Sequence, residues 1–507
     1  MNVVGCTWSF DLKRDMKMKI ARFKARLCAQ GFTQVKGIDW FRKHSHTVPL
    51  DIFRLFLAKM ASLGYEVTEI DYKTAYLNAL LDIIVYMKQP PGYEAVDENG
   101  DILTGPNGEE LVCRLIRSIY GLVQSGLMWE EEHHSTLRKE DWEQCPGETC
   151  LFKKEVDGQT YYLCTYVDNC YLGFPPGSKE REGTVKALAG YYELTDLGEV
   201  CYSIGARIVQ NPRLKQISLH QKPMIDNIAE DYKEYIVEPK RKSYRSIPYD
   251  HDDVITRSAP DDPSIKLWTE KCLKLGGRLN YVAVFTRPDI SAALSFCMQH
   301  VSGASESLFR ALMVIVRYVR DTSDYAITYG ATVRVPFRDH LVKHSRKLSE
   351  DVGDLLDVCF MSDSSHGGPR PMACSIGFIK GAPYVWKMGK LTWTTLNVCE
   401  GEWFAQTNGV MILQAHAHIY VFLGIEHTLP VLSFCDNQSA IAISEAGGTT
   451  KRLKHVLTRM AYLQEKVDEK LVVLLHIDTT GMIADIGTKM LNATEFHRVR
   501  ELLVATP

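Results

Sequence analysis

The residues best suited to chemistry in this chain are two aspartates, each of which follows an apolar, strand-forming run. Asp168 stands in the polar tip 166–169, between the apolar runs 161–164 and 170–174. Two β-rich runs around a compact polar pair predict a hairpin with an acidic tip. An earlier strand-like run ends at Asp71 in the same way. Two strand-borne carboxylates suit a pair of divalent cations, as two-metal phosphoryl transfer requires.

A second acidic set lies in the last third of the chain. Asp363 and Asp436 each follow an apolar run, and Glu400 and Asp485 lie near the starts of expected helices. On a mixed sheet these four acids would form a cage for a hard divalent cation. Each also has a structural interpretation, as a helix cap for these acids and as a turn residue for Asp168. The pattern alone leaves both interpretations open.

The basic start of the chain offers cations to an anionic partner. Alternation over residues 22–27 predicts a strand with Arg22, Lys24 and Arg26 on one face. Such a face is either a solvated edge, which lysine commonly protects, or a grip on phosphates.

Hydrophobic periodicity predicts the elements that position these residues. Asp51 is expected to cap the helix 50–63, and the apolar run 409–425 reads as a buried helix rather than a membrane span, because it contains Gln414, His416 and His418. Other helices are expected at 179–192, 308–320, from 439, and at 453–467, with a closing helix that has Asp485 near its start. Strands are expected at 66–71, 83–87, 201–210, 216–220, 358–361, 375–380, 391–395, 431–434 and 471–477.

Composition sets the class of protein. The chain has 507 residues, 45% hydrophobic and 24% charged, with a net charge of −3, so a nucleic-acid partner would need a local basic surface. The 14 cysteines show no C-x-x-C spacing, which argues against a zinc module and a disulfide scaffold. Asp11, Lys13 and Arg14 interrupt any signal peptide. We expect an intracellular protein, cytoplasmic or nuclear and not secreted.

Several motifs occur in a fixed order along nearly the whole chain, and together they resemble one known family. They are residues 22–32, 71–78, 86–93, 118–122, 166–168, 196–198, 286–290 and 435–441. The set resembles the reverse transcriptase and RNase H region of copia-type LTR retrotransposon polyproteins. The resemblance implies an α+β and α/β chain: a right-hand polymerase of fingers, palm and thumb, then a helical connection and an RNase H-like mixed-sheet domain.

The expected domain boundaries follow from this resemblance and from changes in composition. They are fingers and palm 1–174, a thumb-side palm extension 175–237, a linker 238–263, the helical connection 264–330, a second linker 331–354, and the RNase H-like domain 355–507.

The resemblance also implies roles for single residues of the polymerase. Asp71 and Asp168 match the palm carboxylates that hold two Mg²⁺ or Mn²⁺ ions. Lys24 and Arg26 match cations that touch the nucleotide phosphates. Tyr76 matches the aromatic gate below the sugar, and Gln124 a residue that lines the nucleotide pocket.

Asp363, Glu400, Asp436 and Asp485 match the RNase H carboxylates, which also hold two such ions. The implied partners are an RNA template, a DNA primer, an RNA–DNA hybrid and deoxynucleoside triphosphates, with no membrane partner; oligomeric state stays open.

Some positions depart from the family pattern. Asn169 replaces a second aspartate, and an amide is a poorer ligand for a hard cation. Basic positions are missing from 123–127, the acidic triplet 130–132 follows Trp129, and Ser365 stands where a second acid is common. We expect an RNA-directed DNA polymerase with RNase H activity from a truncated, degenerate copy of such an element. Our hypothesis from Asn169 is that polymerase activity is reduced or lost while RNase H activity survives. The alternative to an active enzyme is a remnant that only binds nucleic acid or retains the nuclease. His455 has no assigned role.

Overall fold

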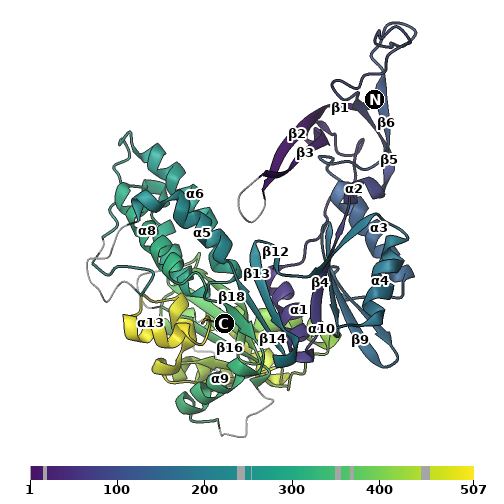
Figure 1. Cartoon of the computed structure of the whole chain (residues 1–507). Coiled ribbons are helices and arrows are strands. Elements are labelled where there is room, and N and C mark those ends of the chain that lie inside the picture. The colour runs from purple at the N-terminus through teal and green to yellow at the C-terminus, as the bar shows by residue number, and fades with distance from the viewer. Residues whose placement is uncertain are drawn as a thin grey trace. The chain divides into compact units, whose positions relative to one another are not determined.

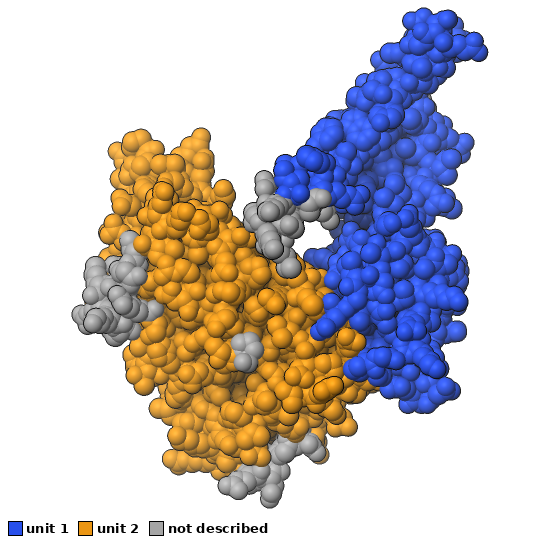
Figure 2. All heavy atoms as spheres, in the orientation of Figure 1, with its two compact units in different colours: residues 1–48, 68–199 blue, residues 49–67, 200–507 orange. Residues whose placement is uncertain are grey.

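The computed structural model describes residues 2–14, 20–236, 246–252, 254–348, 356–365, 370–446 and 457–506. The chain forms two compact units, coloured separately in Figure 2. Unit 1 comprises residues 1–48 and 68–199, and unit 2 comprises residues 49–67 and 200–507. These units divide the chain differently from the expected domains, because residues 49–67 fold with the C-terminal part of the chain.

The central element of unit 1 is a six-stranded sheet of order β11-β4-β10-β9-β8-β7. Its strands are β4 (Glu66–Tyr72), β7 (Glu143–Gln144), β8 (Leu151–Val156), β9 (Gln159–Tyr166), β10 (Asn169–Phe174) and β11 (Leu194–Glu199). Helices α3 (Ser125–Lys139) and α4 (Lys179–Ala189) cover one face (Figure 1) and share with it a core that includes Ile70, Trp129, Leu172 and Leu188.

The rest of unit 1 consists of strand ribbons and short segments. A three-stranded sheet joins β1 (Val3–Val4), β5 (Leu80–Lys88) and β6 (Val112–Arg117). A two-stranded ribbon joins β2 (Cys6–Arg14) to β3 (Ile20–Ala29), and the short helix α2 (Ala75–Asn78) follows β4. The predicted strand with its cations is thus the second half of a hairpin.

Unit 2 contains a four-stranded sheet with helices packed around it. The sheet has the order β12 (Tyr202–Ser203), β13 (Ala206–Asn211), β14 (Gln216–His220) and β15 (Ile327–Tyr329). The helices are α1 (Leu50–Leu63), α5 (Lys222–Asp231), α6 (Ile265–Phe285), α7 (Ser291–Met298) and α8 (Glu306–Asp321). Figure 1 shows α5, α6 and α8 grouped together.

A five-stranded mixed sheet lies in the same unit. Its order is β18 (Ala382–Lys390), β17 (Met372–Ile379), β16 (Val358–Ser364), β19 (Val431–Cys435) and β20 (Val472–His476). β16 pairs antiparallel with β17 and parallel with β19. The long helix α10 (Val398–Leu423) packs on β16 and β17, followed by α11 (Gln438–Ala446), α12 (Leu457–Asp468) and α13 (Ala493–Arg500).

Some predicted elements are wrong in place or type. Residues 331–344, expected as linker, form helix α9 (Ala331–His344), which contains Pro336 in its second turn. The third strand in chain order of the five-stranded sheet is Ala382–Lys390 rather than 391–395. It begins earlier because Lys380 and Gly381 form a two-residue turn with positive φ at both positions. Asp485 lies in a 3-10 turn, Ile483–Gly487, and not at the start of the closing helix.

The fold class is as predicted: a mixed α/β chain with several sheets, consistent with a polymerase followed by an RNase H-like domain. The run predicted as a buried helix, 409–425, is helical in α10 up to Leu423, but only one side of it is buried, because Met411 and Val421 are exposed. Among the described residues, no helix combines the length and apolar character needed to cross a bilayer.

Candidate active sites

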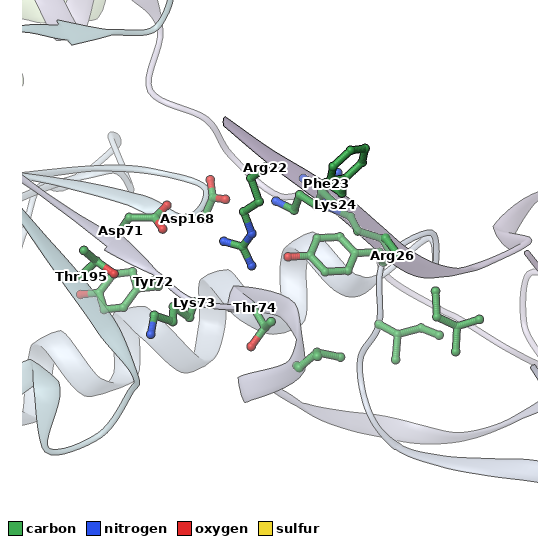
Figure 3. Close-up of a pocket in the computed structure, with 15 residues that line it drawn as sticks. Arg22, Phe23, Lys24, Arg26, Asp71, Tyr72, Lys73, Thr74, Asp168 and Thr195 are labelled. Carbon is green, nitrogen blue, oxygen red and sulfur yellow. The ribbon is translucent and has the colours of Figure 1, made fainter. Parts of the chain in front are cut away.

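A pocket of about 600 Å³ in unit 1 brings the two strand-borne aspartates together with the cations of β3. Figure 3 shows Asp71 and Asp168 side by side, with Arg22 and Lys24 extending toward the same space. Its polar and charged lining includes Arg22, Lys24, Arg26, Asp71, Lys73, Tyr120, Asp168 and Thr195. The pocket therefore places cations opposite carboxylates, as a phosphate ligand bound through divalent ions requires.

Sheet pairing fixes the two aspartates. Asp71 lies near the end of β4, and Asp168 lies in the two-residue turn between β9 and β10, the neighbour of β4. The backbone N–H of Tyr72 donates a 2.9 Å hydrogen bond to the carbonyl of Asp168. The predicted acidic hairpin is therefore present, and its tip is bonded to the strand that carries the other acid.

The turn that carries Asp168 has a strained residue. Val167 adopts φ 57°, a left-handed conformation that β-branched residues rarely take. The indole Nε1 of buried Trp129 donates a 2.7 Å hydrogen bond to the Val167 carbonyl. Trp129 on α3 thus holds the strained turn from the helical side of the sheet.

Two tyrosines border the aspartates. Tyr120 lines the pocket, and the Arg26 guanidinium lies 5.5 Å from its ring centroid. Burial and the Asp168 carboxylate raise the pKa of Tyr120, and the same two causes raise the pKa of Tyr76. The two rings contact each other, with centroids 5.0 Å apart. Tyr76 is therefore close enough to Asp168 to feel its charge, but it is not among the described residues that line the aspartate pocket, and its role as a sugar gate stays a prediction. Tyr120 was missed as a site residue although it lies within the 118–122 motif.

Gln124 does not lie where the sequence predicts. Its side chain is buried, with Nε2 donating to the Asp39 carbonyl at 2.9 Å and Oε1 accepting from Gln34 at 3.1 Å. Among the residues described, the lining of the aspartate pocket does not include it. Both ends of the amide thus join the start of α3 to residues 34–39, the segment that follows β3.

The acidic triplet after Trp129 is partly neutralised by its neighbours. Glu130 accepts hydrogen bonds from the His46 backbone N–H at 2.7 Å and contacts its ring Nδ1 at 2.8 Å. Glu131 forms a salt bridge with Arg42 at 2.6 Å. These pairings reduce the negative surface that the sequence predicts at this point.

A second pocket of about 570 Å³, in unit 2, collects acids from the five-stranded sheet and α10. Asp363 ends β16, Asp436 follows β19, and both side chains line this pocket. Lys489 contacts Asp363 at 3.4 Å and Asp485 at 2.6 Å, so Asp485 adjoins the cluster. Other lining residues are Ser364, Glu402, Asn437, Gln438, Ser439, His476 and Thr479.

The fourth acid of this cluster is Glu402, and the prediction of Glu400 is wrong in its geometry. Glu400 accepts from the Leu396 N–H at 2.8 Å and from Asn397 Nδ2 at 3.0 Å, while its own N–H donates to the Asn397 side chain at 3.1 Å. This is a capping-box arrangement at the start of α10. Glu402 accepts from Ser364 of β16 at 3.0 Å and lines the pocket.

Crowding of acids changes their protonation. Burial, with Asp363 and Asp436 nearby, raises the pKa of Glu402 to about 9. Burial and Asp363 raise the pKa of Asp485 to about 8. A cation bound between carboxyl groups that repel one another in this way would favour their ionised forms.

The donor set of this pocket fits a hard divalent ion. In the part of the chain that is described, Glu402, Cys435 and Asp436 each offer a ligand atom within 4.8 Å of the others. Burial raises the pKa of the Cys435 thiol, and two of the three possible ligands, Glu402 and Asp436, are carboxyl groups. Carboxylate oxygens select Mg²⁺ or Mn²⁺ rather than a soft metal. Ser365 instead accepts a 2.9 Å hydrogen bond from the Met372 N–H, and His455 lies outside the described residues.

We compared the amino-acid sequence of the chain with those of known proteins. Residues 1–237 match the family model described as Reverse transcriptase (RNA-dependent DNA polymerase). A retrovirus-related Pol polyprotein from transposon TNT 1-94 of Nicotiana tabacum is 26% identical over 98% of this chain and 35% of its own length. One from transposon RE1 of Arabidopsis thaliana is 25% identical over 98% of this chain and 31% of its own length. Over nearly its whole length, the chain is thus similar to Pol polyproteins of copia-type transposons.

The match to yeast transposons is similar in extent. The Ty1-NL2 Gag-Pol polyprotein of Saccharomyces cerevisiae is 23% identical over 97% of this chain and 26% of its own length. The chain thus spans about a third or less of the length of these curated relatives.

Solved structures of two kinds align with this chain. A foamy viral protease–reverse transcriptase in complex with double-stranded DNA aligns with a TM-score of 0.45 and 11% identity, over 90% of this chain and 63% of that one. An RNase H1 isolated from compost aligns with a TM-score of 0.22 and 17% identity, over 26% of this chain and 92% of that one.

Proposed function

We propose that unit 1 carries an RNA-directed DNA polymerase site with Asp71 and Asp168 at its centre. The observation that carries this proposal is the single pocket in which both carboxylates face the cations of β3. A site that transfers a nucleotide must hold a triphosphate and its metal ions against a primer end, and this pocket contains ligands for both.

The acidic and the basic residues of the pocket would bind different ligands. Asp71 and Asp168 would hold two Mg²⁺ or Mn²⁺ ions, which supply activation of the primer 3′-hydroxyl and neutralisation of the phosphates. Arg22, Lys24 and Arg26 would contact the triphosphate. Tyr76 stays the proposed gate beneath the sugar, and Gln124 would act through its hydrogen bond to the Asp39 carbonyl.

The proposed partners follow from this chemistry. They are an RNA template, a DNA primer and deoxynucleoside triphosphates, bound as polyanions by a local cationic face on a chain with a net charge of −3. An intracellular location stays a prediction, and oligomeric state stays open.

Primer extension tests the polymerase site. The full chain, Asp71→Asn and Glu155→Gln, a control in an exposed acid on β8, would be assayed on an RNA template with Mg²⁺ and with Mn²⁺. We expect extension by the parent chain and the control, and a loss of at least about 100-fold in Asp71→Asn, equivalent to about 2.7 kcal/mol of transition-state stabilisation. Equal extension by all three would refute the assignment.

We also propose that the pocket of unit 2 is an RNase H site that cleaves RNA in an RNA–DNA hybrid. The gathering of Asp363, Glu402, Asp436 and Asp485 favours this second activity. These acids would hold two divalent ions, which supply a nucleophilic water and charge stabilisation at the phosphodiester. Hybrid cleavage that survives unchanged in Asp436→Asn would refute this assignment.

The alternative, a remnant with a silent polymerase, has a clear signature in the same assays. Hybrid cleavage without extension by the parent chain would support it. Asn169 is the sequence feature that favours this alternative, and its environment in the fold is therefore decisive.

A further inference from the structure

Asn169 has a partner that its sequence neighbourhood does not reveal. It begins β10, directly after Asp168, and its Nδ2 donates a hydrogen bond to Oε1 of Glu69 on β4. Glu69 precedes Asp71 by two residues and is only 6% exposed. The contact therefore links the neutral position of the hairpin to an acid on the strand that carries the other proposed metal ligand.

Strand alternation places these residues on one face of the sheet. Ile70, Tyr72 and Cys170 belong to the core shared with α3. Because side chains alternate between faces, Glu69 and Asp71 on β4 and Asn169 on β10 lie on the opposite face. β4 and β10 are neighbours, so the Glu69–Asn169 pair and Asp71 occupy the same side of two adjacent strands.

Hydrogen-bond chemistry fixes the orientation of the amide. Asn169 presents its Nδ2 donor to Glu69, whose carboxyl Oε1 accepts. The remaining polar atom of the side chain is Oδ1, and amide oxygens are ligands for hard cations. An aspartate at 169 would instead bring two carboxylates into contact at a largely buried position, where like charges repel strongly.

We propose that Glu69 is a positioning residue of the polymerase site, which orients the Asn169 amide and retains the negative charge that the hairpin lacks. The inference rests on the proposed polymerase function. Glu69 on β4 would then supply a third acid beside Asp71 and Asp168, in place of an acid at the start of β10. Restoring aspartate at 169 alone then damages the site, and only an exchange of both residues restores it.

A double-mutant cycle tests this in the full chain, with Asp436→Asn present throughout to weaken metal binding at the nuclease pocket. The four versions are the parent, Glu69→Gln, Asn169→Asp, and both together. Titration with Mn²⁺ alone, followed by calorimetry, gives the affinity of the site. Thermal unfolding and the kcat and KM of primer extension are measured on the same preparations.

We expect each single change to weaken Mn²⁺ binding by about 10-fold, the size typical of residues that orient metal ligands. Asn169→Asp also lowers the unfolding temperature, whereas Glu69→Gln keeps the shape of the side chain. The double exchange returns Mn²⁺ affinity, unfolding temperature and kcat toward the parent, because it swaps the acid and the amide between the strands. In the single variants kcat falls more than KM rises.

Two results would overturn the inference. One is Asn169→Asp binding Mn²⁺ more tightly than the parent and extending primers faster; the other is additive effects with no recovery in the double variant. Failure of the parent to extend primers would count against the proposed polymerase function instead, while Mn²⁺ affinity and unfolding temperature would still decide whether the two residues are coupled.

Discussion

At the scale of single residues, Glu400 and Glu402 lie within one turn of α10 but have different surroundings. Each residue of an α-helix is rotated by about 100° from the one before it, so residues two apart lie on nearly opposite sides. Only one of the two can therefore face β16. Glu402 faces it through Ser364, and Glu400 caps the helix start. The pair is therefore a matched test of the nuclease assignment.

We predict that Glu402→Gln lowers hybrid cleavage by at least about 100-fold, while Glu400→Gln leaves it within a few-fold of the parent and lowers the free energy of unfolding by about 1 kcal/mol. Cleavage of a labelled RNA–DNA hybrid and chemical unfolding measure the two effects. The opposite pattern would return the catalytic role to Glu400.

The raised pKa values in the same pocket predict a pH dependence. Glu402, with a pKa of about 9, and Asp485, with a pKa of about 8, hold protons in the folded apo state that the unfolded chain releases near pH 4–5. Stability contributed by these groups is therefore present at low pH and falls as pH rises toward 8–9.

Binding of Mn²⁺ to this pocket must displace those protons. In an Asp71→Asn background, used to weaken binding at the polymerase pocket, we expect Mn²⁺ affinity to rise between pH 6 and 9, by up to about tenfold per pH unit for each proton released. Calorimetry in two buffers with different ionisation enthalpies measures that release. A pH-independent affinity with no proton release would contradict the raised pKa values.

At the scale of elements, the β9–β10 hairpin depends on α3 for the conformation of its tip. The Trp129 indole bonds to the carbonyl of Val167, the residue with positive φ. Trp129→Phe keeps most of the packing and removes this donor. We predict a loss of about 1 kcal/mol in stability and a drop of about tenfold in kcat for primer extension.

Trp8→Phe is the control for that change. Trp8 also donates from its indole to a carbonyl, that of Pro91 at 3.1 Å, but it lies on the β2 strand and is only partly buried. Unfolding and extension assays on both variants separate the effect of a lost indole donor from the effect of a loosened turn. Equal kinetics for the two would exclude a role for α3 in holding the turn.

At the scale of the whole molecule, the units are not consecutive segments of the sequence. Helix α1 comes early in the chain but is part of unit 2, where buried Arg54 donates to the carbonyls of Tyr384 at 2.6 Å, Val284 at 3.0 Å and Phe285 at 2.9 Å. Arg54 also stacks on Trp386, 4.1 Å from the ring centroid.

A fragment of residues 200–507 therefore lacks a core helix. We predict that it aggregates or unfolds without a cooperative transition, because burial of α1 is lost and three carbonyls lose their donor. A fusion that supplies residues 49–67 through a Gly/Ser linker should recover cooperative unfolding and hybrid cleavage. Thermal unfolding and light scattering of both fragments provide the measurement, and a stable fragment 200–507 would contradict this account of unit 2.

The sequence by itself determined most of the helices and strands and the residues whose side chains could bind metal ions or act in catalysis. Local periodicity placed α1 at its observed bounds, and the apolar runs before Asp71, Asp168, Asp363 and Asp436 became strands that deliver those acids. Such features depend on interactions within a few residues, which a sequence displays directly.

Tertiary structure decided which of those residues share a site. Glu402 rather than Glu400, the burial of Gln124, the assignment of α1 to unit 2 and the pairing of Asn169 with Glu69 all depend on contacts between residues far apart in the chain. Packing selects one rotation of each helix and one register of each strand pair, so chemistry that local sequence leaves open is settled only when distant elements meet.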